Sequence, residues 1–167
     1  QPSYVKKVVF PIELLPLAVV GTAMVQFLIG SAVLLLALLF TQGLPATAWL
    51  WPLAWLPLLA LAAGISFMLA ALTVYLRDLA QLTGFVATLL LFLSPVFYSL
   101  DSAPPGWQQW LLLNPLTVPI EVTRSLLIKG TGIPLAPWGW HAAGCAAALW
   151  AGWWIFQRTR KGFADVI

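Results

Sequence analysis

Residues 14–40 read LLPLAVVGTAMVQFLIGSAVLLLALLF, an apolar run without a single charged side chain. About 18 or more consecutive apolar residues are enough for a helix to cross a bilayer. The charge-free stretch continues to Leu76, which leaves room for a second crossing. Of the 167 residues, 62% are hydrophobic and 8% are charged, against about 25% charged in a soluble domain. These features predict an all-α integral membrane protein.

Turn residues and charges divide the chain into four predicted transmembrane helices. Gly43 and Pro45 punctuate the chain after the first helix, and Arg77-Asp78 forms a polar hairpin between the second and the third. The predicted spans cover residues 14–40, 49–75, 79–98 and 138–157.

The distribution of lysine and arginine predicts the orientation, because short cytoplasmic segments carry an excess of these residues. With four spans, the segment 1–13, the turn at Arg77 and the tail 158–167 share one side. That side holds six of the eight basic residues: Lys6, Lys7, Arg77, Arg158, Arg160 and Lys161. We therefore expect both ends of this fragment to be cytoplasmic.

The segment 99–137 then lies on the external side. Pro104-Pro105-Gly106 turns the chain, residues 107–113 can form a short helix, and Asn114-Pro115 can start a second one. In the second helix, Glu121 and Arg124 are three residues apart and can pair on one face. Two interpretations fit these residues: a re-entrant helical hairpin shielded by protein, or two amphipathic helices lying flat on the outer leaflet.

Most tryptophans fall near the predicted helix ends, where aromatic rings anchor at headgroup depth. Trp107 and Trp110 instead lie in the external segment, and their spacing of three places them on one helix face. The others are Trp49, Trp51, Trp55, Trp138, Trp140, Trp150, Trp153 and Trp154.

The sequence offers little support for catalysis or metal binding. His141 and Cys145 share a helix face, but two ligands do not make a zinc site. No G-x-x-x-x-G-K-[ST] phosphate loop occurs. The span interiors also lack charged residues, which disfavours proton-coupled carriers and channels with a charged filter. The composition permits a passage for a large, polar, mostly uncharged substrate whose transport is powered from elsewhere.

Small residues recur every four positions along the last span, at Gly144, Ala148 and Gly152. Such a stripe marks a helix contact. The contact can lie inside one subunit or at the seam of a dimer, and the sequence leaves both possibilities open.

Four motifs together resemble the permease subunit of type-2 ABC exporters for polysaccharides and polyol phosphates. In order along the chain, they are VKKVVFPIELLPLA, TVYLRDLAQL, LSPVFYSLDSAPPGWQQWLLLNPLTVPIEVTRSLLI and RTRKGFADVI. The resemblance implies six spans in the full protein, of which this chain would be the C-terminal two-thirds, consistent with its start at Gln1 rather than Met.

The same resemblance implies a cytoplasmic coupling helix within residues 1–13 that docks on a separate ATPase subunit. A basic membrane-flanking anchor is the alternative for this segment. Asp78 is expected to cap the third span and Arg77 to contact headgroups or an interface, with a purely structural role as the alternative for both residues. The expected coupling residues are Lys6, Lys7, Phe10, Pro11, Glu13, Arg77 and Asp78.

The external hairpin would correspond to the gate helices of the family. Aromatic rings there could stack on sugar faces, although interfacial anchoring is the competing explanation for each tryptophan. The expected exit-gate and substrate-path residues are Tyr98, Trp107, Trp110, Asn114, Pro115, Glu121 and Arg124.

The resemblance thus implies a non-enzymatic subunit of the bacterial inner membrane that exports lipid-linked O-antigen, capsule or teichoic acid chains. The alternatives are an ABC exporter permease for drugs or lipids, or a membrane assembly protein without a transport role. The expected partners are the ATPase, a second copy of the chain, membrane lipid and the lipid-linked glycan, and no nucleic acid. We expect no cofactor on this chain, with ATP and Mg²⁺ held by the ATPase.

Overall fold

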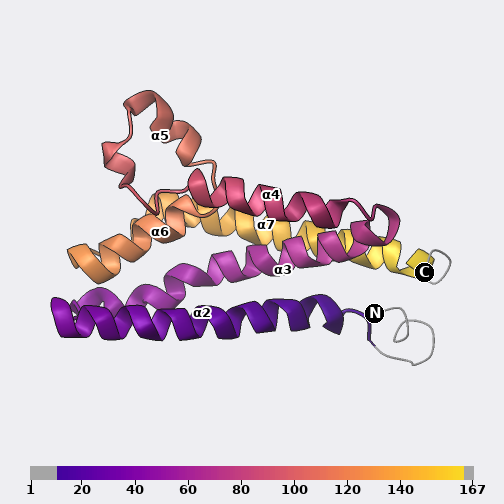
Figure 1. The fold of residues 1–167 in the computed structure, drawn as a ribbon, viewed down its shortest axis with the longest axis horizontal. Coiled ribbons are helices and arrows are strands. Elements are labelled where there is room, and N and C mark those ends of the chain that lie inside the picture. Colours follow the sequence, from indigo (N-terminus) through magenta and orange to yellow (C-terminus); the bar gives the residue numbers. More distant parts are fainter. Residues whose placement is uncertain (1–10, 164–167) are drawn as a thin grey trace.

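The computed structural model describes residues 11–163, and these form helices without any β-strand (Figure 1). The long helices are α2 (Leu14–Thr41), α3 (Trp51–Tyr75), α4 (Leu79–Phe92) and α7 (Leu135–Thr159). Short elements connect them: η1 (Ala46–Leu50), η2 (Leu100–Ser102), α5 (Pro105–Leu111), α6 (Thr117–Arg124), the π-helical turn η3 (Ser125–Lys129) and η4 (Arg160–Gly162).

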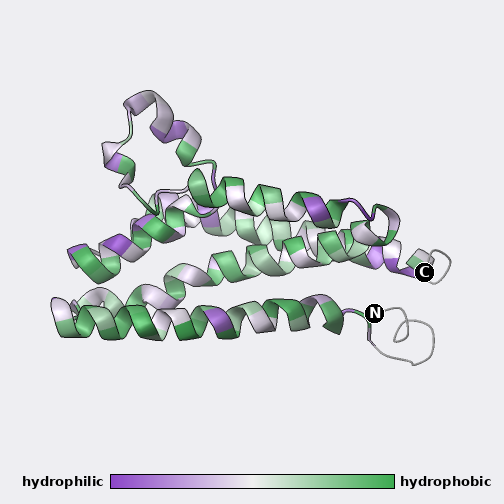
Figure 2. Cartoon of the chain, viewed as in Figure 1, coloured by the Kyte–Doolittle hydropathy of each residue, from purple (hydrophilic) through white to green (hydrophobic). Residues whose placement is uncertain are grey.

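Helix α3 lies between α2 and α7, and both ends of the described chain lie at the same end of the bundle as the α3–α4 turn (Figure 1). Helix α5 projects away from the bundle. Hydrophobic residues cover α2, α3 and α4, whereas hydrophilic ones gather around α5, α6 and the termini (Figure 2).

Two helical segments within residues 11–163 are long and apolar enough to cross a membrane, Leu14–Thr41 and Ala46–Tyr75. They occupy the first two predicted spans. The turn between them follows its sequence signals: the backbone N–H of Gly43 donates to the carbonyl of Leu38, and Gly43 has a positive φ of 78°. This left-handed glycine ends α2 because a residue without Cβ adopts that conformation without strain.

Helix α4 is shorter than the span predicted over 79–98, because it ends at Phe92. Its 14 residues rise about 21 Å, less than the ~30 Å hydrocarbon core. The chain leaves the helix at Ser94-Pro95, where proline lacks an N–H donor and restricts the residue before it. Helix α7 extends past the predicted span 138–157 at both ends, but its Trp, Gly and polar residues lower its hydropathy.

The close packing of α3 against α7 depends on two glycines. A Cβ added to Gly64 would lie 2.6 Å from the carbonyl oxygen of Ala148, and one added to Gly152 would overlap the backbone of Gly64. The small residues Ala148 and Gly152 therefore make a contact inside this chain. Gly144 has open space around its Cβ position.

Two buried clusters lie on α3. The first joins Trp51 and Ala54 of α3 to Val118, Val122, Leu126 and Leu127 of the α6–η3 segment. The second joins Phe67 and Ala71 to Phe156 and Phe163, with Ile12 packed against it. Helix α3 is thus held to the α6–η3 segment near one end and to both ends of the described chain near the other.

Candidate functional site

The first candidate region is the bundle end at which the described chain starts and finishes. Glu13 pairs with Arg160 of η4, and the Tyr75 hydroxyl donates a hydrogen bond of 3.2 Å to the carbonyl of Thr159. Tyr75 also lies against Phe163, with ring centroids 6.3 Å apart. These contacts join the start of α2, the end of α3 and the chain after α7 into one surface.

Some of the predicted coupling residues lie at this end of the bundle, and others lie outside the described residues. Arg77 and Asp78 are exposed in the α3–α4 turn, and neither forms an ion pair with another residue of the described range 11–163. Pro11 is exposed just before α2. Lys6, Lys7 and Phe10 lie outside the described residues.

The expectation that the Asp78 side chain caps the third span is wrong. Asp78 occupies the N-cap position of α4, but its side chain makes no cap hydrogen bond. An N-cap residue normally has extended backbone angles, which aim its oxygen at the free N–H groups. Asp78 already has helical angles of φ −69° and ψ −16°, which do not aim its carboxylate at these N–H groups.

The second candidate region is the segment predicted to be external, residues 99–137, in which Asn114 connects three elements. Its side-chain amide donates a hydrogen bond of 2.9 Å to the carbonyl of Leu90, and its Oδ1 accepts one of 2.9 Å from the backbone N–H of Leu116. Asn114 is buried and Pro115 half-buried. The junction between α5 and α6 therefore sits against the last turn of α4.

The predicted pair of Glu121 and Arg124 forms, with 2.6 Å between Arg124 Nη1 and Glu121 Oε1. The same carboxylate oxygen accepts the backbone N–H of Leu100 at 3.1 Å, and Arg124 Nη2 donates to the carbonyl of Val96 at 3.2 Å. Because both charges also bind backbone groups of residues 96–100, the pair fixes this connecting segment to α6.

Sequence reasoning missed Thr123, which is the polar centre of the contact between α6 and α3. Its hydroxyl accepts hydrogen bonds of 2.9 Å from the indole nitrogens of Trp51 and Trp55, and it donates one of 2.8 Å to the carbonyl of Pro119. Nearby, the Thr47 hydroxyl donates to the carbonyl of Leu126 at 2.8 Å. The four-residue spacing of Trp51 and Trp55 is a signal that they share a helix face, but nothing in the sequence points to Thr123.

These contacts give three of the tryptophans a role inside the chain, in addition to the interfacial anchoring expected for them. Trp51 is 6% exposed, and Trp55 and Trp138 are half-buried. The indole nitrogen of Trp138 donates to the carbonyl of Ala54 at 3.3 Å. The indole groups of Trp51, Trp55 and Trp138 are therefore used inside the chain, to hold helices together.

The predicted aromatic exit-path residues do not form one cluster. Trp107 and Trp110 lie on α5 and are 64% and 69% exposed, whereas Tyr98 is half-buried in the segment before η2. Within residues 11–163, no ring of these three stacks on another aromatic ring.

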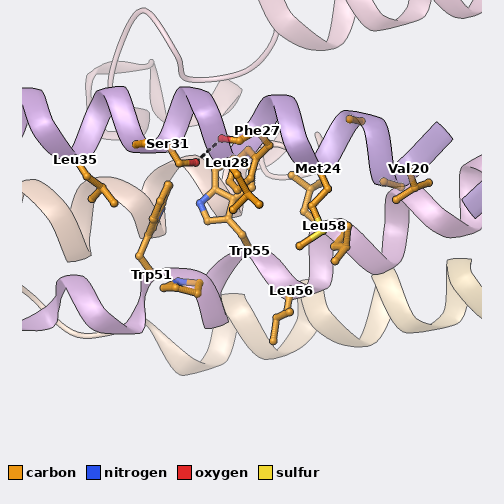
Figure 3. Close-up of a pocket in the computed structure, with 15 residues that line it drawn as sticks. Val20, Met24, Phe27, Leu28, Ser31, Leu35, Trp51, Trp55, Leu56 and Leu58 are labelled. Carbon is orange, nitrogen blue, oxygen red and sulfur yellow. Dashed lines mark hydrogen bonds between the residues drawn. The ribbon is translucent and has the colours of Figure 1, made fainter. Parts of the chain in front are cut away.

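A groove of about 540 Å³ runs between α2 and α3 (Figure 3). Phe27, Trp51 and Trp55 pack at one part of it, with the rings of Phe27 and Trp55 centred 4.8 Å apart. The hydroxyl of Ser31 donates to the carbonyl of Phe27 rather than into the groove. The remaining lining is aliphatic except for the thioether of Met24, so the groove is almost entirely apolar.

A second cavity, of about 390 Å³, lies where the α5–α6 junction meets α7. Asn114 and Pro115 line it together with His141 and Cys145, whose Nε2 and Sγ atoms are 3.5 Å apart. Among the described residues, no three His, Cys, Asp or Glu side chains are grouped closely enough to hold a metal ion.

Comparison with known proteins relates these features to a family. An O-antigen export system permease protein RfbA of Klebsiella pneumoniae is 30% identical over 132 residues, which cover 75% of this chain and 49% of that protein. A second protein of that description from the same species is 29% identical over 133 residues, with 76% and 50% covered. One from Myxococcus xanthus is 30% identical over 169 aligned residues, with 96% and 63% covered. The chain thus spans about half the length of the first two of these relatives.

The family model described as ABC-2 type transporter matches residues 1–128, which run from the N-terminal segment through α6 and most of η3. This range includes both apolar helices, Leu14–Thr41 and Ala46–Tyr75, and the whole Thr123 contact. Because the family model matches more than half of this chain, the chain belongs to the ABC-2 type transporter family.

Proposed function

We propose that the chain is the membrane-spanning part of an ABC exporter permease that moves lipid-linked polysaccharide or polyol phosphate across the bacterial inner membrane. The observation that carries this proposal is the alignment with an O-antigen export permease along 96% of the chain. In the proposed complex, two copies of the permease form the passage and a separate ATPase powers it.

The bundle end that holds Glu13, Arg77 and Asp78 is the proposed ATPase-binding side. The exposed charges of the α3–α4 turn lie at the same end of the bundle as the start of α2, so one docking surface can include both (Figure 1). The Glu13–Arg160 pair and the Phe156–Phe163 contact join this surface to α7. A push on the segment before α2 would thereby reach both α3 and α7.

We propose that α2, α3, α4 and α7 cross the membrane and that the external hairpin is re-entrant. Because α4 is about 21 Å long, its last turn lies short of the far side of the ~30 Å hydrocarbon core. Asn114 binds the carbonyl of Leu90 in that turn, so the α5–α6 junction lies at the same depth. Helices lying flat on the outer leaflet would not reach this carbonyl.

The exposed tryptophans of α5 are the proposed contact with the moving substrate. Trp107 and Trp110 present indole rings that are more than half exposed, and ring faces stack on sugars without demanding one sugar sequence. Glu121 and Arg124 have a positioning role, because their charges are used to hold residues 96–100.

The alternatives remain an ABC exporter permease for drugs or lipids and a membrane assembly protein. The long apolar groove between α2 and α3 is a feature that a lipid exporter could use. The relatives named for O-antigen export favour the glycan.

Affinity purification of the full-length permease from its own membranes tests the proposal. We expect an ATPase in stoichiometric amount, and we expect Lys6→Glu, Lys7→Glu and Phe10→Ala together to reduce its recovery severalfold. Lys129→Glu, an exposed cation in the external segment, is the matched control and should leave recovery unchanged. If no ATPase copurifies with the intact permease, the exporter proposal fails.

Single cysteines test the proposed orientation in a permease whose Cys145 is replaced by alanine. Ser102 and Thr131 are exposed in the external segment, and cysteines there should react with a membrane-impermeant thiol reagent added from outside. A cysteine at exposed Arg77 should react after the membrane is permeabilised. The reverse pattern contradicts the orientation.

A further inference from the structure

The two helices of the external hairpin differ in how they are attached to the rest of the chain. Four residues of α6 are buried: Thr117, Val118, Pro119 and Val122. Leu126 and Leu127 of η3 are buried against α3 as well. In α5, by contrast, Leu111 is the single buried residue, and the element packs mainly on the short η2 turn that precedes it.

Polar contacts sharpen this difference. Thr123 of α6 accepts both indole N–H groups of α3, and the carbonyl of Leu126 accepts the hydroxyl of Thr47 in η1. A buried donor that loses its acceptor is costly, so two N–H groups meeting one hydroxyl make that hydroxyl hard to displace. These bonds join α6 and η3 to elements more than sixty residues away in sequence.

The polar contacts of α5 are local. Gln108 donates to the carbonyl of Ala103 at 3.0 Å, on the side of η2. Thr117 donates to the carbonyl of Leu111 at 2.5 Å, at the junction with α6. A seven-residue helix that is not packed is marginal by itself.

Both segments that flank α5 are themselves fixed. On one side, Glu121 and Arg124 hold residues 96–100 to α6. On the other, Asn114 holds the junction to α4. The chain between these points contains Pro104 before the helix and Leu112-Leu113 after it, so a motion of α5 can be confined to residues 103–113.

We infer that the two hairpin helices have different roles: α6 is fixed to α3 with Thr123 as the positioning residue, and α5 is the arm that moves when the passage opens. This rests on the proposed export function and assigns the motion to one half of the proposed gate. The exposed indoles of Trp107 and Trp110 then travel with the arm, whereas Glu121 and Arg124 stay in place.

Hydrogen–deuterium exchange on the full-length permease, in lipid nanodiscs and without nucleotide, tests the inference. We expect amides of residues 105–111 to exchange at least about tenfold faster than those of 117–129, because amide protection follows local packing. Equal protection of the two segments, as when a second copy covers α5, overturns the inference. This outcome would leave the ATPase-copurification test of the proposed function unaffected.

Variants of Thr123 test the positioning role in the same experiment. Thr123→Val keeps the side-chain shape but removes the acceptor of both indoles, so exchange in 117–129 should rise about tenfold while 105–111 is unchanged. Thr123→Ser, which keeps the hydroxyl, should restore protection. Thr131→Val removes a hydroxyl that bonds locally to the carbonyl of Ser125 and should change little. An unchanged exchange rate in Thr123→Val overturns the positioning role.

A nonhydrolysable ATP analogue, added to the permease with its ATPase bound, tests the motion. The change in exchange should be confined to residues 103–113. A change in 117–129 as large as that in 105–111 overturns the inference, and so does an unaltered α5 in a complex that exports its substrate on ATP addition.

Discussion

Helices α3 and α4 are built from similarly apolar sequence, yet α3 packs closely inside the chain, mainly against α7, and α4 does not. Helix α3 buries Trp51, Ala54, Gly64, Phe67 and Ala71, among others, whereas α4 has no buried residue within the described part of the chain. High hydropathy indicates that a helix has apolar surroundings, but it does not distinguish lipid from protein. Small residues such as Gly64 and Gly152 make this distinction, because they mark the places where another helix packs closely.

The largest expected difference between the two regions comes from truncating a phenylalanine in each. Phe156→Ala on α7 should lower the free energy of unfolding by about 3 kcal/mol, because this ring is 2% exposed and lies against Phe67 and Phe163. Phe85→Ala on α4 removes a ring that is 64% exposed and should change the free energy of unfolding by less than about 1 kcal/mol. Reversible unfolding of the full-length permease in detergent measures both. Equal losses would mean that α4 is as well packed as α7, which contradicts the comparison.

The glycine contact gives a second test with identical chemistry at two positions of α7. Gly152→Ala places a methyl group on the backbone of Gly64, and the resulting shift of α3 against α7 should cost about 2 kcal/mol. Gly144→Ala adds the same methyl group in open space and should change stability by less than about 0.5 kcal/mol. The thermal midpoints of unfolding of the two variants measure these two stability losses. A larger loss at Gly144 would instead locate the critical contact between subunits.

The smallest expected effect lies outside both regions, in the ion pair of Glu13 and Arg160. The side chain of Arg160 is 41% exposed, so a double-mutant cycle with Glu13→Gln and Arg160→Gln should give a coupling energy below about 1 kcal/mol that decreases with salt. A coupling much above this value would make the pair a structural element comparable to the α3–α7 contact.

The sequence predicted the features that depend on local chemistry. The bounds of α2 followed from an unbroken apolar run ended by Gly43, and the Glu121–Arg124 pair followed from helical spacing. The short length of α4 had a signal at Ser94-Pro95, but the apolar residues on either side concealed it.

Contacts between distant segments could not be predicted in the same way. The acceptor for Trp51 and Trp55 is a threonine hydroxyl whose short sequence context resembles any polar position on a helix. The side of α4 contacted by Asn114 depends on where the chain goes after Pro95, and local propensity does not determine that path. Asp78 shows the same limit at short range, because backbone angles rather than residue type decided that it does not cap α4.

The central claim is that this chain is part of a machine that exports a lipid-linked glycan, and the most direct measurement is made in the organism that carries it. Deleting the gene for the full-length permease should remove the exported polysaccharide or polyol phosphate from the cell surface. The lipid-linked chain should then accumulate inside the cell. Supplying the gene again should reverse both effects. Unchanged surface glycan in the deletion strain, with no lipid-linked chain accumulating inside, would contradict the account.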